Sequence, residues 1–153
     1  MMKARKGPNR RSTIRRQGLD SLTIANLIQC QDWKKLKKYL QRATETEQDY
    51  LLDAIDGILP IHRVCQNASS SHACVLEVLL LMLQYKPQLS QALVPHGNQT
   101  IPAGSTPLHI LTIYGFCKMD ILRCLIDAYP DALTIRDHYG RSKSPRGILP
   151  CIF

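Results

Sequence analysis

The chain has 153 residues, of which 44% are hydrophobic and 21% charged, an ordinary balance for one globular domain with a tail. Its longest apolar run, residues 78–83, is far shorter than the roughly 20 residues that a membrane-spanning helix needs. Seven Lys and Arg residues precede the first acid, Asp20, and account for most of the net charge of +8. We therefore expect a globular body, a basic tail and no membrane span.

The tail, residues 1–18, has too few apolar side chains to offset the entropy of ordering, so we expect it to be disordered. Its charges leave three interpretations open: a nuclear signal, a transit peptide or a passive solvated arm. Binding of nucleic acid through residues 3–16 is a further alternative, not favoured because the tail has no aromatic residue for base stacking. No apolar signal segment follows the charges, so we expect an intracellular protein, cytoplasmic or nuclear.

The first part of the body predicts a pair of helices. Asp20 or Ser21 is a suitable N-cap for the first. The second starts at residues 31–32 and has an apolar face at helical spacing, formed by Trp33, Leu36 and Leu40. Its four lysines between residues 34 and 38 could be a docking patch, although a solvated helix face is the more frequent arrangement. The polar stretch 44–48 is expected to close this helix pair.

One motif then occurs twice, as GILPIH at residues 57–62 and as GSTPLH at residues 104–109. In each copy Gly is expected to supply the positive φ of a tight turn, and Pro suits the first turn of a helix. A short helix, a loop and a longer Leu-rich helix follow each copy. We expect the longer helices at about 72–85 and 119–129. The first of these is apolar almost all round, so neighbours must cover it on more than one side.

This repetition resembles the ankyrin repeat, whose pattern reads G-x-T-P-L-H and continues into an apolar helix. Residues 104–126 match it well, and residues 57–83 match less well because Leu59 replaces the capping Thr. The matching motif residues are Gly57, Pro60, His62, Gly104, Thr106, Pro107, Leu108 and His109. The resemblance implies that His62 and His109 are structural and tie adjacent repeat loops together. Another helical-hairpin array is the main alternative.

We therefore predict an all-α fold, a short solenoid of helix-turn-helix ankyrin-like repeats with long finger loops. The tail would end at residue 18 and the repeat domain would span 19–153. Its units would be a degenerate repeat at 20–43, repeats at 56–88 and 104–133, and a truncated repeat at 137–153. Because the last unit lacks an obvious cap, we expect either a truncated fragment or an end that docks onto something. We also expect the second helix of the third unit to leave apolar side chains uncovered.

The resemblance places a protein partner on the concave face, made by the first helices and finger loops. The exposed positions there would be Arg63, Gln66, Ile110, Ile113 and Tyr114, and the surface would extend to a finger tip formed by Asp137, His138 and Tyr139. The connection 88–103 should be an exposed loop, mobile around residues 96–99, since Pro95, Gly97 and Pro102 keep it out of a helix.

The sequence does not favour an enzyme. It has no phosphate-binding loop, nucleophile elbow or histidine and cysteine spacing typical of a metal site. The six cysteines include no C-x-x-C pair, and we expect them to be reduced. We therefore expect a non-catalytic interaction module with no cofactor, no metal and an unknown protein partner.

Overall fold

The computed structural model describes residues 20–68, 72–114 and 119–135. Within these ranges the chain forms seven α-helices and no strand, apart from an isolated bridge between Ile55 and Ile58. The predicted all-α class is therefore confirmed. The basic tail, the segment 137–153 and the residues Asp137, His138 and Tyr139 lie outside the described part. The α-helices are α1 (Ser21–Gln29), α2 (Trp33–Arg42), α3 (Glu45–Gln48), α4 (Pro60–Gln66), α5 (His72–Tyr85), α6 (Pro107–Tyr114) and α7 (Met119–Ala128), and the 3₁₀ turns are η1 (Asp49–Leu52), η2 (Pro87–Gln91) and η3 (Pro130–Leu133).

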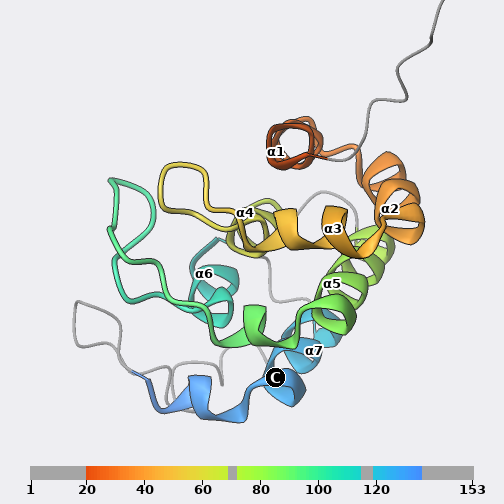
Figure 1. Ribbon diagram of the computed structural model, residues 1–153. Helices are drawn as coiled ribbons and strands as arrows, with labels where there is room; N and C mark the ends of the chain where they lie inside the picture. Colours follow the sequence, from red (N-terminus) through yellow and green to blue (C-terminus); the bar gives the residue numbers. More distant parts are fainter. Residues whose placement is uncertain (1–19, 69–71, 115–118, 136–153) are drawn as a thin grey trace, which may run out of the picture.

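Six of the helices lie in two layers (Figure 1). In one layer α1 packs on α4 and α4 packs on α6, and in the other α2 packs on α5 and α5 packs on α7. Two long loops, 53–59 and 92–106, extend from the first layer on the side away from α5 and α7 (Figure 1). We call them the first and second finger loops.

The helix starts follow from capping side chains. The carboxylate of Asp20 accepts a hydrogen bond from the backbone N–H of Thr23 at 2.6 Å, as the sequence predicted for the first helix. The carboxylate of Asp32 does the same for Lys35 at 3.1 Å at the start of α2. Each cap satisfies one of the backbone donors that a helix N-terminus leaves without an intrahelical partner.

The polar stretch 44–48 does more than close the first helix pair, because it forms the short helix α3. Thr44 caps this helix, and the Glu47 side chain accepts a hydrogen bond from the backbone N–H of Thr44 at 2.8 Å. This reciprocal arrangement is a capping box, whose sequence signature is a Thr followed three residues later by Glu.

Helix α5 lies at the centre of the second layer, between α2 and α7. Its inward side chains are completely buried, namely Val75, Val78, Leu79 and Met82. Leu80 alone among the described large hydrophobic residues of this helix is widely exposed, at 51%. Cover from two neighbours explains why the helix is apolar almost all round.

The expected uncovered face on α7 is not found. Ile121, Leu122 and Leu125 are all at most 3% exposed, and among the large hydrophobic side chains of this helix only Met119, at 38%, is widely exposed. In the described ranges, no helix combines the length and the apolar character needed to cross a membrane.

Candidate interaction surface

The tip of the first finger loop is a tight two-residue turn at Asp56 and Gly57. Both residues have positive φ, 56° and 74°, the combination that a type I′ hairpin turn requires. The flanking Ile55 and Ile58 exchange two backbone hydrogen bonds of 3.1 Å each. The positive φ expected at Gly57 is therefore confirmed, and Gly104 has the same property at 73°.

Hydrogen bonds fix the second finger loop at its base and near its tip. At its base, the N–H of Val94 donates to the carbonyl of Ser105, and the N–H of Gly104 donates back to the carbonyl of Val94. Nearer its tip, the side-chain oxygen of Asn98 accepts hydrogen bonds from the backbone N–H groups of residues 100 and 101. The prediction of an exposed loop over 88–103 is wrong at Leu89 and Ser90, which are buried within η2, and at Val94 and Ile101, which are buried in the loop itself. Residues 95–100 are exposed.

Two buried histidines connect the first-layer helices to segments far along the chain. The Nε2–H of His62 donates to the carbonyl of Ala92 at 3.0 Å, and that of His109 donates to the carbonyl of Ile135 at 3.0 Å. Both rings are completely buried. Each histidine therefore ties its helix to a later segment of the chain.

The two histidines differ in their other ring nitrogen. Nδ1 of His109 accepts hydrogen bonds from the backbone N–H and the hydroxyl of Thr106, at 3.1 and 2.7 Å. Leu59 occupies the position equivalent to Thr106, and Nδ1 of His62 has no partner among the described residues. Burial lowers the pKa of His62 below its ordinary value, against a smaller opposite effect of the bond to Ala92. His62 is therefore neutral near pH 7.

Of the five predicted surface positions in the described part, Ile110 does not fit. It was expected to be exposed and is completely buried. Arg63 is half-buried and braces the first finger loop by donating to the carbonyl of Ile55 at 2.9 Å. Gln66 and Tyr114 are half-buried, and Ile113 is 39% exposed.

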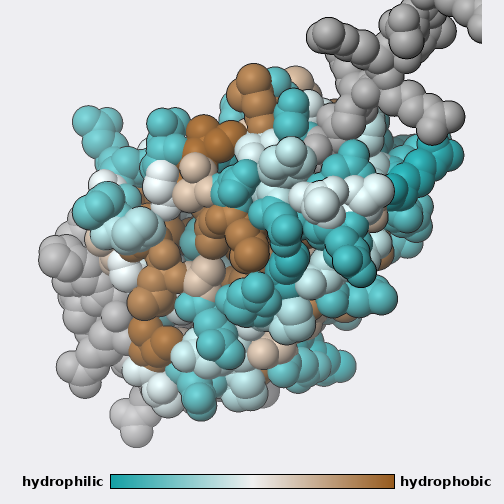
Figure 2. Space-filling model, in the orientation of Figure 1, coloured by the Kyte–Doolittle hydropathy of each residue, from teal (hydrophilic) through white to brown (hydrophobic). Residues whose placement is uncertain are grey.

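Leu93, at the base of the second finger loop, is an exposed residue that the sequence analysis missed. Half of its surface, 50%, is open to solvent. The sequence does not single it out, because Val94 and Ile101 in the same loop are also bulky apolar residues and both are buried. Figure 2 shows the molecule in the orientation of Figure 1. Hydrophobic side chains gather where α4, α6 and the finger loops lie, whereas hydrophilic ones cover the side of α2.

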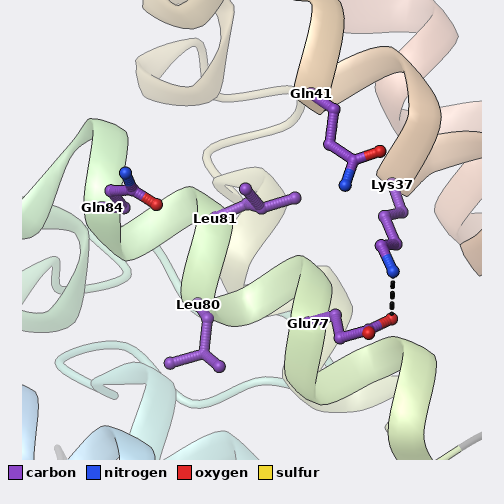
Figure 3. A pocket seen from close by; sticks show the side chains of 6 residues that line it. All are labelled: Lys37, Gln41, Glu77, Leu80, Leu81 and Gln84. Atoms are coloured by element: carbon purple, nitrogen blue, oxygen red, sulfur yellow. Dashed lines mark hydrogen bonds and ion pairs between the residues drawn. The ribbon is translucent and has the colours of Figure 1, made fainter.

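A hollow of about 270 Å³ lies between α2 and α5 on the second layer. An ion pair crosses it, with 2.7 Å between Nζ of Lys37 and a carboxylate oxygen of Glu77. Figure 3 shows Leu81 pointing toward α2 and Leu80 pointing away from it. The pair joins the two helices at their exposed edges, where such a contact is worth about 0.2–1 kcal/mol.

The described cysteines are free thiols, and two of them have altered acidity. Burial raises the pKa of Cys65, and the neighbouring Cys124 adds to the effect. Burial and the charge of Asp127 raise the pKa of Cys124. Both thiols are therefore poor nucleophiles at neutral pH. Within the described ranges, no three His, Cys, Asp or Glu side chains are grouped so that they could hold a metal ion.

Comparisons with protein families, with curated proteins and with solved structures give no match for this chain.

Proposed function

We propose that this protein is a non-catalytic protein-interaction module built as a short solenoid of ankyrin-like repeats. Three features support this reading: the recurring motif at 57–62 and 104–109, the layered packing of consecutive helix pairs, and the equivalent bonds of His62 and His109. In such an array each unit covers its neighbours and leaves one continuous face for a partner.

The partner binds the face formed by α6, the end of α4 and the second finger loop. The observation that carries this assignment is the pair of exposed apolar side chains there, Ile113 on α6 and Leu93 on the loop. Exposed apolar side chains with half-buried polar and aromatic neighbours are typical of interface centres. Gln66 at the end of α4 and Tyr114 at the end of α6 are half-buried, whereas Arg63 is occupied in bracing the first finger loop.

Affinity capture from the source cell, followed by titration of the purified partner, tests the proposal. Ile113→Asp places a charge in the interface and is expected to weaken binding at least tenfold. Leu80→Asp is the matched control, because it changes an equally apolar and more exposed residue on the other layer. Equal binding by both variants and the wild type would show that this face is not the interface.

A further inference from the structure

The exposed side of α2 carries a concentrated positive charge that the proposed protein interface does not use. The helix contains four lysines and Arg42 within ten residues and no acid. The remainder of the body, residues 20–153 without α2, has eight basic and twelve acidic residues. The positive potential of the body is therefore concentrated on this one helix.

Four of the five basic side chains of α2 are of two kinds. Lys37 faces α5 and is paired with Glu77. Lys35, Lys38 and Arg42 make no ion pair or side-chain hydrogen bond with another residue in the described ranges, and all three are exposed. Together with Tyr39 they line a hollow of about 260 Å³ on the side of α2 away from Glu77. We call these four residues the α2 basic face.

The spacing of the α2 basic face suits an extended polyanion. Its positions are i, i+3, i+4 and i+7, so they lie along one side of the helix over about 10 Å. Three cations spread over that length match successive phosphates better than a single compact anion. The half-buried ring of Tyr39 among the cations adds an aromatic surface on which a base can stack.

We propose that the α2 basic face binds single-stranded nucleic acid, through its phosphates at Lys35, Lys38 and Arg42 and through a base at Tyr39. An anionic membrane fits less well, because the apolar residues that would insert are at most 2% exposed, namely Trp33, Leu36 and Leu40. An acidic protein fits less well, since lysines are depleted from protein–protein interfaces, whereas they are common contacts to phosphate. The site is separate from the face that contains Ile113.

Fluorescence anisotropy of the full chain with a labelled single-stranded oligonucleotide of about 20 nucleotides tests this binding over a range of salt. Each phosphate contact to a single strand contributes about 0.7 to the slope of log K against log salt. The triple variant Lys35→Gln, Lys38→Gln, Arg42→Gln should therefore lower the slope by about 2 and weaken binding at least tenfold. Since the basic tail is present in every sample, its contribution to the slope cancels when a variant is compared with the wild type.

Three matched variants make the test specific. The charge-preserving triple Lys35→Arg, Lys38→Arg, Arg42→Lys should bind like the wild type. Arg123→Gln, which removes an exposed cation from α7, should leave the slope unchanged, whereas Lys38→Gln lowers it. Tyr39→Phe should retain binding, and Tyr39→Leu should weaken it about tenfold.

The proposal fails if the glutamine triple, shown by circular dichroism to be folded, keeps the wild-type slope. It also fails if phosphatidylserine vesicles or a polyglutamate peptide bind the full chain more tightly than the oligonucleotide and lose that binding in the same triple variant.

Discussion

His62 and His109 form equivalent hydrogen bonds, but only the His109 ring is hydrogen-bonded at both nitrogens. Each donates from Nε2 to a distant backbone carbonyl, but only His109 also accepts a bond at Nδ1, from Thr106. A buried polar atom without a partner costs about 1–3 kcal/mol. The segment that contains Leu59 and His62 therefore lacks a stabilising hydrogen bond that the segment containing Thr106 and His109 has.

This difference predicts the effect of exchanging Leu59. Leu59→Thr supplies a hydroxyl that caps α4 and can donate to Nδ1 of His62, but it also removes part of a half-buried apolar side chain. Leu59→Val removes a similar apolar volume without adding the hydroxyl. We expect the Thr variant to be more stable than the Val variant by about 1–2 kcal/mol in urea denaturation. Equal stability would mean that the Thr hydroxyl does not reach the ring.

His62 also predicts how stability depends on pH. Its pKa is lower in the folded protein than the ordinary 6.5, because burial disfavours the charged ring. The unfolded chain therefore binds the proton more readily than the folded chain does. Neutral His62 contributes fully to the free energy of unfolding above about pH 6.5, and this contribution is lost as the pH falls through the folded-state pKa.

His62→Gln is the variant that isolates this contribution, because the Gln amide can still donate to the carbonyl of Ala92 but does not titrate. Denaturant unfolding between pH 7.5 and pH 5, as a rough working range, should show a shallower loss of stability in the variant than in the wild type. Parallel curves would mean that His62 does not contribute to acid destabilisation.

At the scale of the elements, the second finger loop is anchored at its base and exposed at its tip. Val94 and Ile101 are buried, and residues 96–99 between them are exposed. Limited proteolysis of the folded body should therefore cut first within 96–99. Gly97→Ala should speed the cut, because a Cβ at this position would lie 2.4 Å from the backbone nitrogen of Ala103 and the loop would have to open. First cleavage within α5 would contradict this assignment.

The helices and their starts could be predicted from the sequence because their signals are local. Asp20, Pro60 and the apolar spacing of α2 each act within one or two turns. Helix α3 was missed because a four-residue helix has no apolar period and is marked only by its capping box. The burial of Ile110 and the bracing role of Arg63 depend on packing and on contacts of α4 with the first finger loop, which neither residue's own position in the sequence reveals.

At the scale of the whole molecule, α4 and α5 occupy the centre of their layers. Helix α4 is covered by α1 and α6, and α5 is covered by α2 and α7. The outer helices, α1 and α6 in the first layer and α2 and α7 in the second, have one such neighbour each in the described part. Where stability is a sum of nearest-neighbour contacts, the central helices open only when the stack opens, and the outer ones can open alone.

Hydrogen exchange with matched core truncations tests this ordering. Leu79→Ala creates a cavity in α5, at a completely buried position, and Leu27→Ala creates one in α1, where the side chain is 8% exposed. Each is expected to cost about 2–5 kcal/mol locally. Leu79→Ala should lower the protection of all the described helices together, because α5 contacts both outer helices of its layer. Leu27→Ala should lower protection in α1 and its partner α2 while α5 to α7 keep theirs. If Leu27→Ala lowers protection uniformly along the chain, the molecule unfolds as one unit and the layered ordering is wrong.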